Sequence, residues 1–158
     1  MNYYWIIGGN LGDRLGLLEK ARALMSEKIG VIVRQSNIYQ TQAWGYTHQP
    51  DFLNQVVVTN SVLSPEEAIM QAQKIELLLG RERHQRWHER TMDIDMLYAE
   101  NQIIENELLV VPHRYISERK FVLVPLAEIA PDFIHPVLQL SNQQLLAQCS
   151  DVSEVKVL

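Results

Sequence analysis

The chain has 158 residues, 47% of them apolar and 21% charged, with 14 Lys+Arg against 19 Asp+Glu and a formal net charge of −5. This size and composition predict a single domain, residues 1–158, with a core large enough to fold without a disulfide or a structural metal. The negative balance argues against nucleic acid and anionic membrane surfaces as partners. No apolar run reaches the roughly 20 residues of a membrane-spanning helix. We therefore expect a cytoplasmic protein, and nothing favours a state other than a monomer.

Strands and helices alternate along the predicted secondary structure. Strands are expected at residues 2–7, 31–39, 52–62, 92–98, 103–104 and 108–111, from their β-branched and aromatic content. Helices are expected at residues 12–28, 64–79, 125–129 and 141–149, from apolar spacings of three and four and from capping signals. The glycine pair Gly8-Gly9 is expected to end the first strand in a turn. Residues 141–158 are expected to pack as a helix and tail against the sheet.

The order of these elements predicts the fold class. The order β-α-β-β-α followed by further strands is typical of an α+β protein. It favours a ferredoxin-like α/β/α sandwich, with a mostly antiparallel central sheet and helices on both faces.

An acidic pair lies on the strand expected at residues 92–98. Side chains alternate along a strand, so Asp93 and Asp95 share one face, while Met92, Ile94, Met96 and Tyr98 are expected on the other. Two neighbouring carboxylates repel each other unless positive charge lies between them. One or two carboxylates plus phosphate oxygens are a usual Mg²⁺ site. The alternative is that both carboxylates are solvated or paired with arginines.

An arginine-rich loop comes directly before the acidic pair. Residues 81–90 carry four arginines, namely Arg81, Arg83, Arg86 and Arg90. The planar guanidinium group binds phosphate oxygens bidentately, so the loop and the acidic pair together favour a site for Mg²⁺ and a polyphosphate. The sequence lacks the glycine-rich phosphate loops of P-loop and dinucleotide-binding proteins. Side chains and metal are therefore expected to hold any nucleotide.

Aromatic and amide side chains occur on both sides of the acidic pair. Trp44 lies in a polar loop and is either an aromatic wall for a flat ring or an anchor over the core. Asn54 offers a donor and an acceptor to a heterocycle edge. Further along the chain, His113, Arg119 and Phe121 add an imidazole, a cation and another aromatic ring. An isolated histidine is more often a structural hydrogen-bonding residue than a catalyst.

Short motifs along about four-fifths of the chain occur together in a fixed order. They begin with Ile7-Gly8-Gly9-Asn10-Leu11-Gly12-Asp13 and end with Pro125-Leu126-Ala127-Glu128-Ile129-Ala130-Pro131. Between these are Tyr39-Gln40-Thr41, Trp44-Gly45, Gln49-Pro50-Asp51-Phe52-Leu53-Asn54, Ile75-Glu76, Gly80-Arg81, Arg86-Trp87, Arg90, Asp93-Ile94-Asp95, Pro112-His113 and Glu118-Arg119-Lys120-Phe121-Val122-Leu123. In this combination the chain resembles the 6-hydroxymethyl-7,8-dihydropterin pyrophosphokinase family of folate biosynthesis.

The resemblance implies a reaction and a set of site residues. The family transfers the β,γ-diphosphate of ATP to the hydroxymethyl oxygen of a reduced pterin, giving AMP. The residues implied to be catalytic are Arg81, Arg90, Asp93 and Asp95, with Asp93 and Asp95 as ligands of two Mg²⁺ ions. Those implied to bind ATP are Gln73, Glu76, Arg81, Arg83, Arg86, Arg90, His113 and Arg119. Those implied to bind the pterin are Thr41, Ala43, Trp44, Phe52, Asn54, Trp87 and Phe121.

Two other functions are weighed against this one. A metal-dependent nucleotidyl- or glycosyltransferase would also use an Asp-x-Asp pair, but the sequence lacks the further motifs such enzymes carry. A non-catalytic paralogue that binds pterin or nucleotide is the second alternative. It is motivated by His88-Glu89, which stands where the family usually has Gly-Pro.

Overall fold

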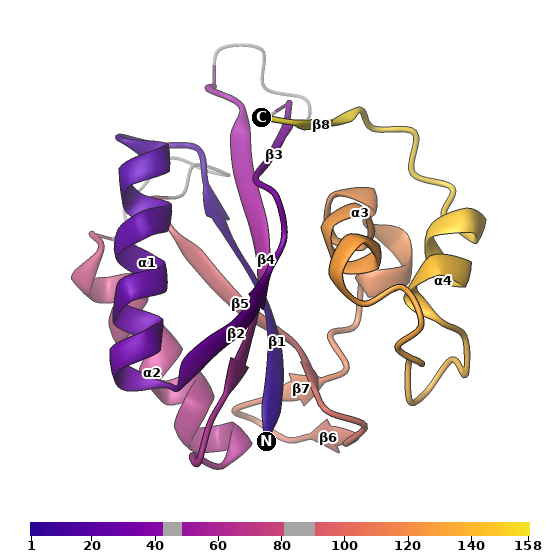
Figure 1. The fold of residues 1–158 in the computed structure, drawn as a ribbon, viewed down its shortest axis with the longest axis horizontal. Coiled ribbons are helices and arrows are strands. Elements are labelled where there is room, and N and C mark those ends of the chain that lie inside the picture. Colours follow the sequence, from indigo (N-terminus) through magenta and orange to yellow (C-terminus); the bar gives the residue numbers. More distant parts are fainter. Residues whose placement is uncertain (43–48, 81–90) are drawn as a thin grey trace.

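The computed structural model describes residues 1–42, 49–80 and 91–158 (Figure 1). The strands are β1 (Asn2–Gly9), β2 (Val31–Gln35), β3 (Tyr39–Thr41), β4 (Phe52–Asn60), β5 (Asp93–Ala99), β6 (Ile104–Glu105), β7 (Val110–Val111) and β8 (Val155–Val157). The helices are α1 (Arg14–Lys28), α2 (Pro65–Leu78), α3 (Lys120–Ile129) and α4 (Asn142–Gln148), with a 3₁₀ turn at Ile116–Glu118. No helix in these described residues is long and apolar enough to cross a membrane.

The main sheet has the order β5-β1-β4-β3-β8, and β2 also pairs with β4. Every pairing is antiparallel. β2 pairs with the C-terminal half of β4 and β3 with its N-terminal half. The units β1-α1-β2 and β4-α2-β5 interleave, because β4 lies between β1 and β2 while β1 lies between β4 and β5. This is the ferredoxin-like arrangement, and the predicted fold class is confirmed.

Helices cover both faces of the sheet (Figure 1). One apolar cluster joins α1 and α2 to the sheet through residues such as Leu18, Met25 and Ile75. A second joins α3 and α4 to the opposite face through residues such as Leu123, Leu126 and Leu145. Ile6, Leu97 and Val122 of this second cluster also line a pocket on the same face of the sheet.

Local capping signals set three of the helix starts. The Ser64 hydroxyl accepts from the Glu67 N–H at 3.2 Å, and the Glu67 carboxylate accepts from the Ser64 N–H at 3.1 Å. These hydrogen bonds also lower the pKa of Glu67. Ser141 and Gln144 form the same reciprocal box at α4, and Asp13 accepts from the Gly16 N–H at α1. The helix starts predicted at residues 12, 64 and 141 are confirmed to within two positions.

Two expected strands differ from the structure. Gly8 and Gly9 do not form a turn but continue β1, paired with Asn54 and Leu53 of β4. The strand expected at 31–39 is divided into β2 and β3. Ser36 bonds to Val56 through its N–H and its hydroxyl. The next residue leaves the sheet, because the Asn37 N–H donates to Glu128 of α3.

The face assigned to Tyr98 was wrong. The register with β1 shifts between Met96 and Tyr98, where Leu97 is an extra residue in β5. This bulge moves Tyr98 to the α3 side of the sheet, while Met92, Ile94 and Met96 stay on the α1–α2 side. The Tyr98 hydroxyl donates to the Asn142 side chain at 2.7 Å, so the bulge ties β5 to α4.

A buried histidine predicts a pH dependence of stability. His135 is 5% exposed, and its Nδ1 accepts from the N–H groups of Val137 at 3.2 Å and Leu138 at 3.0 Å. Burial lowers its pKa. The folded chain therefore binds fewer protons than the unfolded chain, and the free energy of unfolding should fall as the pH drops below about 6.5.

Urea unfolding at about pH 7.5 and pH 5.5 measures this effect. His113 also has a lowered pKa, so the comparison is with His135→Asn, which should lose less stability between the two pH values. Equal losses in both proteins would contradict the assignment to His135.

Candidate active site

The sheet face toward α3 brings the predicted polar residues together through strand register. Gly8 of β1 lies opposite Asn54 of β4 on one side and Asp93 of β5 on the other. Two residues away on the same face of β1, Ile6 lies opposite Asp95. Because side chains alternate, Asn54, Gly8, Asp93 and Asp95 form one continuous floor.

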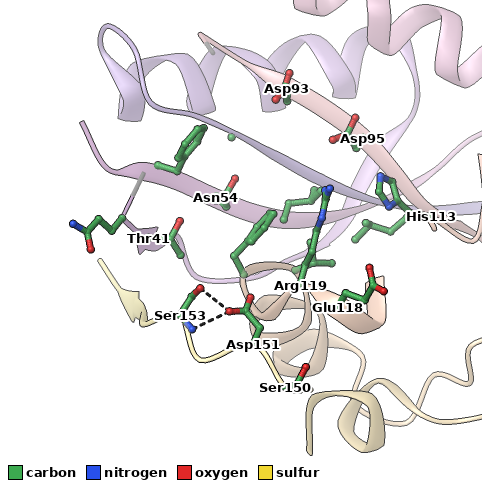
Figure 2. A pocket seen from close by; sticks show the side chains of 17 residues that line it. Thr41, Asn54, Asp93, Asp95, His113, Glu118, Arg119, Ser150, Asp151 and Ser153 are labelled. Atoms are coloured by element: carbon green, nitrogen blue, oxygen red, sulfur yellow. Dashed lines mark hydrogen bonds between the residues drawn. The ribbon is translucent and has the colours of Figure 1, made fainter. Parts of the chain in front are cut away.

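A pocket of about 710 Å³ opens over this floor (Figure 2). Eight predicted site residues line it, namely Thr41, Phe52, Asn54, Asp93, Asp95, His113, Arg119 and Phe121. In the view of Figure 2, the two aspartates lie on β5 at one side, and Ser150, Asp151 and Ser153 lie at the other, with Asn54 and Arg119 between them. Residues up to 147 positions apart in the chain, from Ile6 to Ser153, thus share one cavity.

The start of α3 supplies one wall. The Arg119 guanidinium lies over the ring of Tyr115, 4.8 Å from its centroid, and 5.8 Å from the ring centroid of Phe121. Phe121 is half-buried and faces the pocket. The wall therefore combines a flat aromatic surface with a cation held over it.

His113 lies at the same side of the pocket and is neutral near pH 7. Burial lowers its pKa, and the positive charge of Arg119 adds to the effect. Its Nδ1 accepts from the Tyr115 N–H at 3.2 Å. The proton of the neutral ring is therefore on Nε2, which leaves a single N–H donor for a ligand.

The acidic pair fits a hard divalent cation. Asp93 is half-buried, Asp95 is exposed, and both line the pocket from one strand. Their oxygens are the donors that Mg²⁺ prefers, and phosphates and water complete its coordination. Among the described residues there is no cluster of three or more metal-binding side chains. Phosphate oxygens of a bound polyphosphate would be further ligands of such a cation.

Two predicted ATP residues lie outside this pocket. Gln73 is exposed on α2, and the buried Glu76 accepts from the Ile94 N–H at 2.8 Å, at the outer edge of β5. Neither lines the cavity, and their nucleotide contact stays a prediction. Seven other predicted residues lie outside the described parts of the chain, namely Ala43, Trp44, Arg81, Arg83, Arg86, Trp87 and Arg90.

Several pocket residues were not predicted. Gly8 belongs to the glycine motif but was expected in a turn, and Glu118 adjoins the predicted Arg119. The C-terminal residues Ser150, Asp151 and Ser153 carry no motif at all. The pairing of β8 with β3 and the hydrogen bond from the Lys120 N–H of α3 to Asp151 bring this segment to the site, and both are long-range contacts.

Comparison with known proteins identifies the family. Residues 4–131 match the model of 7,8-dihydro-6-hydroxymethylpterin-pyrophosphokinase. Relatives named 2-amino-4-hydroxy-6-hydroxymethyldihydropteridine pyrophosphokinase include one from Bacillus subtilis, 45% identical over 80% of this chain and 76% of the relative. Another, from Haemophilus influenzae, is 37% identical over 98% of this chain and 96% of the relative.

Solved structures agree on the fold. The wild-type HPPK-DHPS of Plasmodium falciparum superposes with a TM-score of 0.72 at 16% identity, over 93% of this chain and 43% of that one. The chain thus spans less than half of that larger protein. The family, the enzyme class and the pyrophosphokinase step predicted from the sequence are confirmed by the sequence matches. The chain belongs to the 7,8-dihydro-6-hydroxymethylpterin-pyrophosphokinase family.

Proposed function

We propose that this pocket transfers the β,γ-diphosphate of ATP to the hydroxymethyl oxygen of 6-hydroxymethyl-7,8-dihydropterin and releases AMP. The observation that carries the proposal is the convergence of eight predicted site residues on one cavity. Its volume of about 710 Å³ suits a small-molecule site. Its floor is acidic at β5, and its wall is aromatic and cationic at α3.

The side of the pocket near β3 and β4 suits the pterin. Phe52 and Phe121 present apolar rings. Each aromatic pair with the flat heterocycle would contribute about 0.5–1.5 kcal/mol of binding free energy beyond that of burying apolar area. Asn54 is 8% exposed and Thr41 also 8%, so their polar groups are held in place by the sheet. We assign the remaining pterin contacts to Ala43, Trp44 and Trp87.

The side near β5 suits the phosphates. We assign Asp93 and Asp95 as ligands of two Mg²⁺ ions, which would supply Lewis acidity and a template for the phosphates. The Arg119 guanidinium and the Nε2–H of His113 donate to phosphate oxygens. Phosphoryl transfer through a loose transition state needs mainly in-line positioning and charge neutralisation, and these donors provide both.

The remaining proposed contacts with the phosphates and the pterin come from residues 81–90. We propose that Arg81 and Arg90 contact the transferred phosphates, that Arg83 and Arg86 add charge, and that Trp87 closes over the pterin. Gln73 and Glu76 are assigned to the nucleotide. The positive charge of the four arginines would offset the acidic floor when MgATP is bound.

We further propose that residues 1–158 form one domain acting as a cytoplasmic monomer. The support is that residues for both substrates line one cavity of one chain. Light scattering should give the mass of a single chain, 18.3 kDa. Twice this mass would contradict the monomer without affecting the assignment of the reaction.

The reaction is tested on the unmodified chain by measuring AMP. Formation of AMP should require Mg²⁺, ATP and 6-hydroxymethyl-7,8-dihydropterin together, because no product forms unless both substrates occupy the cavity. AMP formation without pterin, or release of ADP, would contradict the reaction. Binding of both ligands without turnover would favour the non-catalytic paralogue.

The amide of Asn54 should determine affinity for the pterin. Asn54→Leu keeps the size of the side chain but removes its donor and acceptor, so polar atoms of the bound pterin lose their partners. We expect the KM for pterin to rise about 10- to 100-fold with kcat changed little, since the amide contributes to ground-state binding. Steady-state kinetics in both substrates measure this, and an unchanged pterin KM would remove Asn54 from the site.

A further inference from the structure

The C-terminal residues 149–158, here called the C-terminal strap, connect two walls of the pocket. In Figure 1 the strap runs from α4 past α3 to β3. Its strand β8 pairs with β3, where Val155 lies opposite Thr41. At its other end, Asp151 accepts from the Lys120 N–H of α3 at 3.1 Å. The strap therefore holds the wall with Thr41 and the wall with Phe121 together.

Asp151 caps a helix that has no cap of its own. Helices α1, α2 and α4 are capped by Asp13, Ser64 and Ser141, each at the helix start. The equivalent position of α3 is Arg119, whose side chain makes no capping bond. Asp151 supplies the acceptor from 31 residues away. Position 119 is thereby available for a cationic side chain that faces the pocket.

The carboxylate of Asp151 is occupied by the protein itself. Oδ2 accepts from Lys120, and Oδ1 accepts from the Ser153 N–H at 2.9 Å and the Ser153 hydroxyl at 2.6 Å (Figure 2). Burial pushes its pKa up, but these hydrogen bonds and the charge of Lys120 outweigh burial and hold the pKa below its usual value. With both oxygens engaged and the charge retained at a helix N-terminus, its surroundings favour a structural role over ligand contact.

We propose that Asp151 is a positioning residue that fixes the first turn of α3, and with it Phe121 and Arg119, against the β3 and β4 side of the pocket. The carboxylate acts through the Lys120 N–H, one residue from each of these two side chains. Loss of the cap frees this turn, so the aromatic wall spends less time in the geometry that binds the pterin. The identity of the ligand rests on the proposed function.

The test compares Asp151→Ala with Ser64→Ala, which removes a cap of the same kind from α2, away from the pocket. A lost cap shifts the helix-start equilibrium roughly 2- to 30-fold. We expect Asp151→Ala to raise the KM for pterin within that range, with kcat changed less than twofold. Asp151→Asn, which keeps one acceptor oxygen, should restore part of the affinity. Ser64→Ala should leave the pterin KM unchanged.

Amide hydrogen exchange gives a readout that does not need turnover. Exchange across residues 119–123 should be faster in Asp151→Ala than in the unmodified chain and unchanged in Ser64→Ala. Unchanged exchange in Asp151→Ala, or an equal rise of pterin KM in both variants, would overturn the proposal. If the unmodified chain forms no AMP, the proposed reaction fails, while the exchange comparison still tests the positioning role.

Discussion

Replacing Asp95 with alanine is expected to lower AMP formation by on the order of 10³-fold or more while the fold is kept. Asp95 is exposed on the pocket floor, two positions from Asp93. Metal-assisted charge stabilisation is worth several kcal/mol, and each 1.36 kcal/mol corresponds to about tenfold in rate. Because the side chain is exposed, the free energy of unfolding should change by less than about 0.5 kcal/mol.

The control for this variant is Asp132→Ala, which removes an exposed carboxylate outside the pocket. It should keep full activity. The two measurements are initial rates of AMP release at saturating ATP and pterin, and urea unfolding of each variant. Wild-type turnover in Asp95→Ala, or equal losses of activity in both variants, would contradict a role of Asp95 in the reaction.

Replacing Gly8 with alanine is expected to damage stability and pterin binding together. A Cβ at position 8 would lie 2.1 Å from the Asn54 Oδ1 and 2.3 Å from the Leu53 carbonyl oxygen. The second atom belongs to the backbone of β4, which is paired with β1 and cannot move aside freely. Overpacking of this kind costs about 1–3 kcal/mol of unfolding free energy. Displacing Asn54 should raise the pterin KM by at least about tenfold.

Gly16→Ala is the matched control for this crowding. A Cβ there would lie 2.2 Å from the Asp13 Oδ2, but that atom ends a side chain that can rotate away. Alanine also suits a helix better than glycine, which offsets the weakened cap, so stability should change by less than about 1 kcal/mol. The pterin KM should stay unchanged. A Gly8→Ala protein with lost stability and a normal pterin KM would show that Gly8 acts on the fold alone.

Elements with local signals were predictable from the sequence, and elements set by distant contacts were not. The start of α2 follows from Ser64 and Glu67, three residues apart, so the prediction required no tertiary information. At the start of α3 the Lys120 N–H donates to Asp151, which lies 31 residues further along the chain. The sequence predicts that this helix begins at Pro125, but Pro125 lies inside it. The strand β8 exists because β3 offers it an edge, which its own three residues do not reveal.

The candidate site shows the same division. Asp93, Asp95 and Asn54 belong to motifs whose chemistry can be recognised in the sequence, and the structure brings them into one pocket. The role of Gly8 could be recognised only from the register of β1 with β4 and β5. The predicted face of Tyr98 was wrong because strict alternation of side chains assumes a strand without a bulge, and β5 has one at Leu97.

The most direct test of the central claim is to identify both products of the unmodified chain with Mg²⁺, ATP and 6-hydroxymethyl-7,8-dihydropterin. Phosphorus NMR distinguishes AMP from ADP and a pterin diphosphate from a pterin monophosphate in one sample. The proposed diphosphate transfer predicts AMP and the pterin diphosphate in equal amounts. ADP with a pterin monophosphate, or AMP with free pyrophosphate and unchanged pterin, would contradict it.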